Sequence, residues 1–190
     1  SKEYKFKVVE DASHALGGEY KGKKIGNCKY SDMSVFSFHP VKMITTGEGG
    51  AVTTNSKSLD EKVSLLRTHG ITKDPSQFYS KPHGDWYYEQ QSLGYNYRLT
   101  EIQAALGISQ LKRLDSFVSK RKEIAEFYLQ NLDKKITPIQ LSDTNSSWHL
   151  FVVQVSNRQK IYQQLKDSGI QSQVHYIPVN SQPFYNHKNL

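Results

Sequence analysis

The chain has 190 residues, 36% of them hydrophobic, with 25 Lys and Arg residues against 18 Asp and Glu residues and a formal net charge of +7. This length fits one domain, or one domain and part of a second, and the 12% aromatic content excludes an intrinsically disordered chain. No apolar run approaches the about 20 residues that span a bilayer. The single cysteine, Cys28, excludes an internal disulfide framework and fits a reducing compartment.

The first half of the chain predicts three short strands, separated by glycine-rich turns, over residues 6–9, 34–38 and 49–54. A helix is expected to follow over 58–68, and Gly70 is expected to end it. Residues 71–94 are polar and rich in aromatic residues, without an apolar period. They predict a long loop, and such a loop in a compact domain usually serves a function.

The strongest helical signal begins at Thr100, which forms the hydroxyl-x-x-Gln pattern of a capping box with Gln103. Apolar residues at helical spacing continue from there to Leu132. This pattern is far longer than the mean helix of about 12 residues. It predicts one long helix over residues 100–134 that bridges two domains.

A β-α-β pattern follows the long helix. Strands are expected over 148–155 and 171–179, and a helix capped by Asn157 over 157–166. The pattern predicts the start of a smaller α+β domain in residues 135–190.

Two groups of residues at strand ends could carry chemistry. Asp11 and His14 directly follow a predicted strand, and ligands bind at the carboxyl ends of strands in α/β sheets. Ser37 and Lys42 surround the end of the next strand, where a lysine amine can act as a nucleophile or a base. Taken separately, both groups also fit a turn cap and an ordinary surface charge.

Two further groups of residues could bind a ligand, one through backbone groups and one through positive charge. Hydroxyls and glycines over residues 45–50 permit close approach of the backbone to a ligand, or a tight hairpin turn. Asn96 and Arg98 directly precede a predicted helix N-terminus, which suits an anion and equally suits a capping loop.

Taken together and in order, residues 11–17, 37–50 and 93–107 resemble the DegT/DnrJ/EryC1/StrS family of nucleotide-sugar aminotransferases, which use pyridoxal 5'-phosphate (PLP). The resemblance covers nearly the whole chain. It implies an α/β fold, that of the fold type I, aspartate aminotransferase-like PLP-dependent transferases.

Family members are longer than this chain, so the resemblance implies a partial fold. Residues 1–99 correspond to the C-terminal part of the PLP-binding large domain, residues 100–134 to the bridging helix and residues 135–190 to an incomplete small domain. We therefore expect the chain to be a piece of a longer protein. Because the family's phosphate loop and ring-stacking aromatic residue have no counterpart here, we expect the isolated chain to hold PLP poorly.

The resemblance also implies roles for four of the candidate residues. Lys42 aligns with the lysine that bonds to PLP and moves a proton between the amino donor and the cofactor. Asp11 aligns with the carboxylate that pairs with the pyridine nitrogen, and an ionised Asp keeps that nitrogen protonated. His14 lies where the family has His or Gln near the cofactor ring, and Ser37 matches a hydroxyl that binds the cofactor phosphate.

Five more residues are implied in binding. Asn96 matches an Asn that reaches into the neighbouring subunit's site, where it is expected to contact both cofactor and substrate. It therefore implies a homodimer with shared active sites. Gln173, Val174, His175 and Tyr176 match a stretch that lines the sugar-nucleotide site in the most similar members. No metal site is implied.

Residues 173–178 look closest to the members that transfer an amino group to C4 of a UDP-linked 4-keto-6-deoxy amino sugar. In those members the donor is an amino acid such as glutamate, and the pathway leads to pseudaminic acid in the bacterial cytoplasm. A dTDP- or GDP-sugar aminotransferase acting at C3 or C4 stays open as an alternative, as does an inactive fragment. Some relatives are PLP-dependent sugar dehydratases that carry His in place of the lysine, so Lys42 favours transamination.

A basic, tyrosine-rich nucleic-acid-binding protein is the competing non-enzymatic interpretation. The net charge of +7 and the 12 tyrosines permit it. The Lys and Arg residues are scattered rather than clustered, however, and no RNA-binding motif is present. We therefore expect neither nucleic acid nor membrane as a partner, and assign the charge to the handling of phosphorylated ligands.

Overall fold

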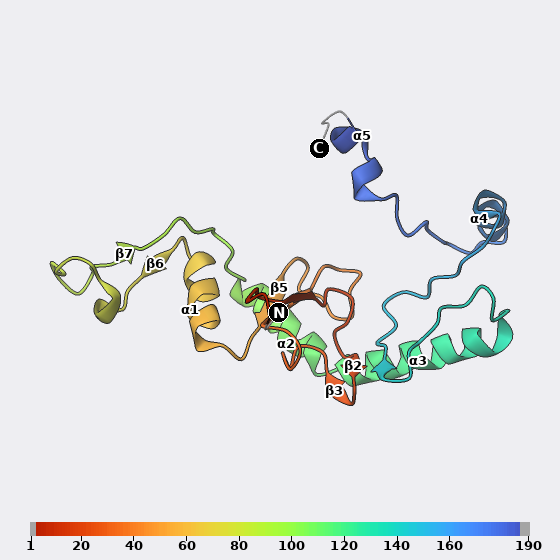
Figure 1. Cartoon of the computed structure of the whole chain (residues 1–190), viewed down its shortest axis with the longest axis horizontal. Helices are drawn as coiled ribbons and strands as arrows, with labels where there is room; N and C mark the ends of the chain where they lie inside the picture. Colours follow the sequence, from red (N-terminus) through yellow and green to blue (C-terminus); the bar gives the residue numbers. More distant parts are fainter. Residues whose placement is uncertain (1–2, 187–190) are drawn as a thin grey trace. The chain divides into compact units, whose positions relative to one another are not determined.

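The computed structural model describes residues 3–186 (Figure 1). These residues divide into two compact units. The first unit comprises residues 3–124 together with Gln140–His149. The second comprises residues 125–139 together with 150–186. Among the described residues, no helix is long and apolar enough to cross a membrane.

A three-stranded sheet lies at the centre of the first unit. Its strands are β1 (Val9–Asp11), β4 (Met33–Ser37) and β5 (Gly50–Thr53), in the order β1-β4-β5. Strand β4 runs parallel to β1 and antiparallel to β5. Ser34 and Phe36 alternate along β4 and are both buried, so one face of this central strand is covered. The strands predicted over 34–38 and 49–54 are confirmed to within one residue.

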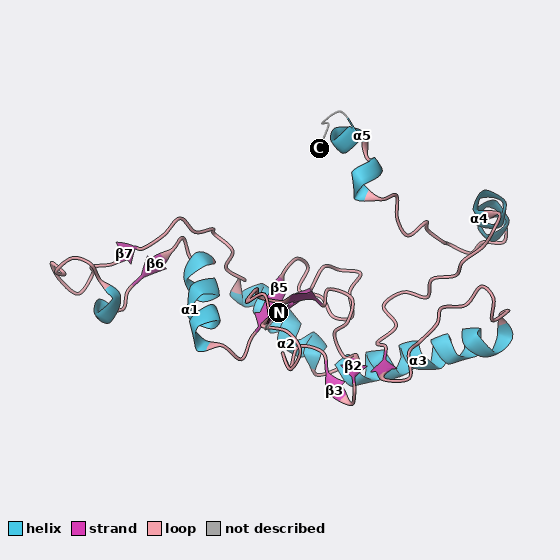
Figure 2. Ribbon diagram, in the orientation of Figure 1, coloured by secondary structure: helices cyan, strands magenta, loops and turns pink. Residues whose placement is uncertain are grey.

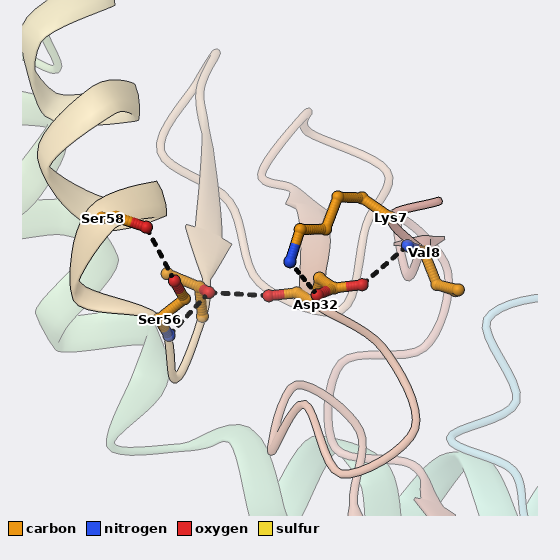
Figure 3. A network of polar contacts seen from close by, with 6 residues as sticks. Lys7, Val8, Asp32, Ser56 and Ser58 are labelled. Carbon is orange, nitrogen blue, oxygen red and sulfur yellow. Dashed lines mark hydrogen bonds and ion pairs between the residues drawn. The ribbon is translucent and has the colours of Figure 1, made fainter. Parts of the chain in front are cut away.

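The strand predicted over 6–9 is wrong, because β1 begins only at Val9 and continues into the acidic residues. Ahead of it, the Asp32 carboxylate accepts hydrogen bonds from the Val8 N–H at 2.8 Å and from Lys7 Nζ at 2.9 Å. The Asp32 backbone oxygen accepts the Thr54 hydroxyl at 2.6 Å (Figure 3). The Asp32 carboxylate thus binds the Val8 N–H, which a neighbouring strand would otherwise use. The β1–β4 ladder therefore begins later than the sequence predicts.

Helix α1 (Lys57–Leu66) follows β5, close to the predicted position. It ends at Leu66, and Gly70, with φ +70°, donates its N–H to the Leu65 oxygen at 2.9 Å. Gly70 therefore supplies the left-handed conformation just past the helix end that favours glycine.

The long loop predicted over 71–94 is partly ordered. It contains an antiparallel strand pair and a short 3-10 helix, namely β6 (Ile71–Thr72), β7 (Glu89–Gln90) and η1 (Pro75–Gln77). The Glu89 carboxylate accepts hydrogen bonds from the Tyr79 and Ser80 N–H groups and the Tyr87 hydroxyl. This polar organisation leaves no apolar period, so periodicity cannot reveal it.

The capping box at Thr100 is confirmed, since the Thr100 hydroxyl accepts the Gln103 N–H and the Gln103 side chain accepts the Thr100 N–H. The single long helix is wrong. It is divided into α2 (Glu101–Leu111) and α3 (Leu114–Asn131). At the break the Arg113 N–H bonds to the Gln110 oxygen, three residues back, which is the tighter 3-10 pattern. Helix α3 contributes to both units.

A second small sheet completes the first unit. Its strands are β2 (Glu19–Tyr20), β3 (Lys23–Lys24) and β8 (Thr144–Asn145), in the order β3-β2-β8. Strand β8 joins β2 across more than a hundred residues of sequence and brings the segment 140–149 into this unit.

The second unit contains helix α4 (Arg158–Asp167), the short 3-10 helix η2 (Val179–Ser181) and α5 (Pro183–Asn186). The predicted helix over 157–166 is confirmed, with Asn157 at the N-cap position but without a side-chain capping bond. The strands predicted over 148–155 and 171–179 are wrong, and both segments are loop or turn except Val179, the first residue of η2 (Figure 2). A strand needs a partner in a ladder, and neither segment joins one within residues 3–186.

Candidate active site

Two parallel strands bring the first candidate residues to one edge of the central sheet. Asp11 is the last residue of β1 and Ser37 the last residue of β4. Asp11 is in register with Val35, two residues before the end of β4, and the Ala12 N–H bonds to the Val35 oxygen at 2.9 Å. Parallel strands end on the same side, so the loops that carry His14 and Lys42 leave the sheet from the same edge.

Asp11 is the electrostatic centre of this edge. Its Oδ1 accepts the Ser13 hydroxyl at 2.6 Å and the Ser13 N–H at 3.1 Å. These two bonds hold the pKa of Asp11 below its ordinary value, partly opposed by burial, and the attraction of His14 and Lys42 lowers it further. The structure therefore brings Asp11, His14 and Lys42 close enough to interact, with the carboxylate in its ionised form.

The loop that carries Lys42 is held by hydrogen bonds and by buried side chains. The Lys42 N–H bonds to the His39 oxygen at 2.9 Å, and the next two residues, Met43 and Ile44, are buried. The Phe38 oxygen accepts both the Thr45 hydroxyl and the Thr46 N–H, each at 3.0 Å. Lys42 itself is half-buried. Its backbone is thus fixed on both sides, which limits where the amine can reach.

Helix α2 packs against the loop that carries Lys42. The Gln103 side-chain amide donates to the Glu48 oxygen at 3.0 Å. One turn further along, a Cβ at Gly107 would lie 2.9 Å from Thr46 Cγ2, and Thr46 is buried. Only a glycine lets the helix approach this closely, so Gly107 sets the distance between α2 and the Lys42 loop.

The loop after β1 is held in a comparable way. The His14 and His149 rings lie 4.3 Å apart between centroids, at a tilt of 56°. The buried Ser147 hydroxyl donates to the His14 oxygen at 3.4 Å. A Cβ at Gly17, which has φ +81°, would lie 2.7 Å from Val118 Cγ2 on α3. The two helices of the predicted long helix therefore each support one of the two loops at the sheet edge.

Ser37 and Asn96 lie in different settings. Ser37 is half-buried at the sheet edge, opposite Gly50, and its hydroxyl accepts the His39 N–H at 3.4 Å. Asn96 is exposed and pairs through its backbone with Thr68, at the base of the β6–β7 hairpin. The structure thus places Ser37 with Asp11, and Asn96 in a separate segment of the same unit.

The predicted substrate residues belong to the second unit. Gln173 and Val174 line a depression of about 460 Å³ together with residues of α4. The His175 and Tyr176 rings lie 4.0 Å apart between centroids.

Sequence reasoning missed three residues of the sheet edge. Ser13 determines the ionisation of Asp11, and the Asp-x-Ser spacing of an Asx-turn could have identified it. Gln103 was read only as part of the capping box, although its amide nitrogen also reaches the Lys42 loop. His149 carries no sequence signal, because it meets His14 only through tertiary folding.

Comparison with known proteins identifies the family of the chain. A family model described as the DegT/DnrJ/EryC1/StrS aminotransferase family matches residues 1–190. The chain is 44% identical over 193 residues to the UDP-4-amino-4,6-dideoxy-N-acetyl-beta-L-altrosamine transaminase of Campylobacter jejuni, covering 97% of this chain and 48% of the relative.

Solved structures give the same result. Helicobacter pylori PseC, an aminotransferase involved in the biosynthesis of pseudoaminic acid, matches with a TM-score of 0.82 and 38% identity over 98% of this chain and 49% of its own. The PMP form of Spr1654 from Streptococcus pneumoniae matches with a TM-score of 0.84 and 33% identity over 96% and 48%.

The chain thus spans about half the length of the relatives it matches. The predicted partial aminotransferase fold is confirmed by these neighbours. The predicted family resemblance is confirmed as well: the chain belongs to the DegT/DnrJ/EryC1/StrS aminotransferase family.

Proposed function

We propose that the native protein containing this chain is a PLP-dependent nucleotide-sugar aminotransferase. It transfers an amino group from an amino acid such as glutamate to C4 of a UDP-linked 4-keto-6-deoxy amino sugar, in a pathway of the pseudaminic acid type. The observation that carries the proposal is the ionised Asp11 with Lys42 and His14 beside it at one sheet edge. The 44% identical relative named as a transaminase of this sugar class supports the choice of substrate.

The residues present fit PLP. The cofactor requires an anion at its ring nitrogen, an amine at its aldehyde carbon and hydrogen-bond donors at its phosphate. Both Ser13 bonds reach Oδ1 of Asp11, and among the described residues Oδ2 accepts no hydrogen bond. Oδ2 is therefore available to the ring nitrogen, while Lys42 supplies the amine and Ser37 a hydroxyl. When bound, PLP takes up the electrons left on the donor carbon as its proton departs.

Each residue then has one task. Asp11 holds a proton on the ring nitrogen, since its low pKa keeps it ionised. With the donor amine bonded to PLP, Lys42 Nζ would be a free amine that could accept the proton from the donor Cα and deliver it to C4′ of the cofactor. His14 would lie near the cofactor ring, and the Ser37 hydroxyl would bind the cofactor phosphate. The hydrogen bonds of the Lys42 loop would restrict the positions that this amine can take.

The remaining roles concern substrate and assembly. We propose that Gln173, Val174, His175 and Tyr176 line the sugar-nucleotide site, and that Asn96 serves the active site of a second copy in a homodimer. Large exposed apolar side chains near Asn96 support an interface there, with Leu93 90% and Ile102 85% exposed.

Two further proposals concern location and domain limits. The single cysteine supports a cytoplasmic location. We propose residues 1–99 as part of the large domain, 100–134 as the connection and 135–190 as part of the small domain.

The test uses the native protein with PLP, glutamate and the UDP-linked 4-keto sugar. Lys42→Ala should abolish amino-sugar formation, with a loss of at least about a thousandfold for a residue that moves the proton. Lys62→Ala, which removes an exposed lysine of α1, is the matched control and should retain activity. Activity retained in Lys42→Ala, or a deoxygenated product in place of an amino sugar, would overturn the proposal.

A further inference from the structure

One arginine of α3 holds the segment 146–149, directly after β8. Arg121 Nη1 donates hydrogen bonds to the backbone oxygens of Trp148, at 3.3 Å, and of His149, at 3.2 Å. Arg121 and this segment both belong to the first unit. Within residues 3–186 Arg121 forms no ion pair, so its charge acts on these two oxygens. Hydrogen bonds from a charged donor are stronger than those between neutral groups.

The segment that Arg121 holds contains an unfavourable backbone conformation. Trp148 has φ +53°, in the left-handed region that residues other than glycine rarely adopt. Such a conformation persists only where the surrounding contacts enforce it. The contacts here are the bond of the Trp148 N–H to the Ser146 hydroxyl at 3.0 Å and the two bonds from Arg121. Because His149 directly follows Trp148, these bonds also set the direction of the His149 side chain.

The same segment contacts His14 at two points. The His149 and His14 rings lie 4.3 Å apart between centroids. The buried Ser147 hydroxyl donates to the His14 backbone oxygen at 3.4 Å. The loop after His14 packs closely here as well, since a Cβ at Gly18 would lie 3.5 Å from the Ser147 nitrogen. Both the ring and the backbone of His14 are therefore held by the segment that Arg121 binds.

His14 in turn acts on Asp11. The pKa of Asp11 is lowered first by the two Ser13 bonds, which burial partly opposes, and then by the attraction of His14 and of Lys42. The attraction between two charges weakens as the distance between them grows. Movement of the His14 ring away from Asp11 would therefore raise the pKa of that carboxyl toward its ordinary value.

We propose that Arg121 is a positioning residue of the active site. Through the backbone oxygens of Trp148 and His149, it holds the His149 ring against the His14 ring and so keeps His14 beside Asp11. The effect of this arrangement on amino transfer rests on the proposed function. The arrangement itself rests on the contacts of Arg121, His149 and His14 within the first unit.

Nuclear magnetic resonance of the native protein without PLP or substrate tests the arrangement. A nuclear Overhauser effect should connect the His14 and His149 rings, and Arg121→Met should abolish it. The pKa of Asp11, followed through its carboxyl carbon, should rise in Arg121→Met. It should return toward the native value in Arg121→Lys, whose ammonium can still donate to a backbone oxygen. Lys120→Met is the matched control, because it removes a positive charge from an exposed site on the same helix, and it should change neither signal.

With PLP, glutamate and the 4-keto sugar, Arg121→Met should lower kcat about tenfold or more and move the acid limb of the pH–rate profile to higher pH. A retained Overhauser effect in Arg121→Met would overturn the proposal, as would an unchanged Asp11 pKa or an unchanged kcat. If Arg121→Met does not fold, His149→Leu tests the same step, since it keeps the backbone oxygens and should raise the pKa of Asp11; an unchanged pKa there would overturn the proposal too. Absence of amino transfer in the native protein would overturn the proposed function alone, because the resonance measurements need neither cofactor nor substrate.

Discussion

The side-chain nitrogen of Gln103 donates to the backbone oxygen of Glu48 at 3.0 Å, while the side-chain oxygen of Gln103 accepts the Thr100 N–H at 2.9 Å. One amide therefore closes the first turn of α2 and holds the loop that carries Lys42. Sequence distance conceals this link, since the two residues are 55 positions apart. Because Gln103 lies in the first turn of α2, the start of this helix helps to position the loop that carries the proposed catalytic amine of Lys42.

Gln103→Glu separates the two tasks of this amide. A glutamate keeps the acceptor of the capping box and loses the donor to Glu48. We expect a small decrease in the thermal stability of the native protein, because one hydrogen bond is lost and a carboxylate oxygen faces the Glu48 oxygen, and a reduced kcat, because the Lys42 loop loses this contact. Gln103→Ala should lose both, with a free energy of unfolding lower by about 1 kcal/mol. Equal kcat in Gln103→Glu and the native protein would show that the contact does not position Lys42.

Ser13→Ala should move the acid limb of the pH–rate profile. The Ser13 bonds lower the pKa of Asp11, so Asp11 stays ionised from neutral pH down to that depressed pKa. The stability that the carboxylate gives is present above its ordinary pKa and is lost as the pH falls through the depressed pKa. Removing the hydroxyl raises that pKa toward its ordinary value, and the activity should then fall at a higher pH. Activity near neutral pH should change little. Ser109→Ala, on the exposed side of α2, is the control and should leave the profile in place.

Gly107→Ala should destabilise the native protein even though alanine favours a helix. The new Cβ would lie 2.9 Å from Thr46 Cγ2, and the buried Thr46 has little room to shift. Overpacking costs about 1–3 kcal/mol, against about 1 kcal/mol gained in helix propensity. Thermal unfolding measures the balance. A net gain in stability would mean that the loop moves away freely, and kcat would then report whether Lys42 moves with it.

The central sheet edge was predictable because it is encoded locally. Asp11 ends β1, whose start the sequence placed too early, and Lys42 follows β4, whose alternation is visible in the sequence. The two strands pair in parallel. The order of the three motif stretches then identified the family. Thr100 and Gln103 marked the start of α2 through side chains only three positions apart.

The wrong secondary-structure predictions fall where the structure is determined by polar side-chain contacts or by contacts between residues distant in sequence. Strand β1 starts late because the Asp32 side chain takes the Val8 N–H. The 71–94 segment folds around the Glu89 carboxylate, which no apolar period signals. The strands expected over 148–155 and 171–179 have suitable composition, but composition does not supply the ladder partner that a strand requires.

Glu89→Gln should loosen the hairpin that carries Lys73 and Tyr88. Desolvation raises the pKa of Glu89, but the hydrogen bonds from the Tyr79 and Ser80 N–H groups and the Tyr87 hydroxyl outweigh it, so the pKa lies below its ordinary value. The stability that the carboxylate gives is present above that ordinary value and is lost as the pH falls through the depressed pKa. Hydrogen exchange at the Tyr79 and Ser80 amides should accelerate in Glu89→Gln and, in the native protein, on acidification beyond the intrinsic pH effect.

Mixing two inactive variants tests whether Asn96 serves the site of a second copy. Lys42→Ala and Asn96→Ala should each be inactive alone. In a mixed dimer with shared sites, the intact Lys42 of one copy meets the intact Asn96 of the other, which restores one of two sites. Random mixing should then recover about a quarter of the native activity, because half of the dimers are mixed. If Asn96 acted within its own chain, no mixture would contain an intact site, and activity would stay absent at every ratio. Lys42→Ala mixed with the control Lys62→Ala should show only the activity of the Lys62→Ala copies.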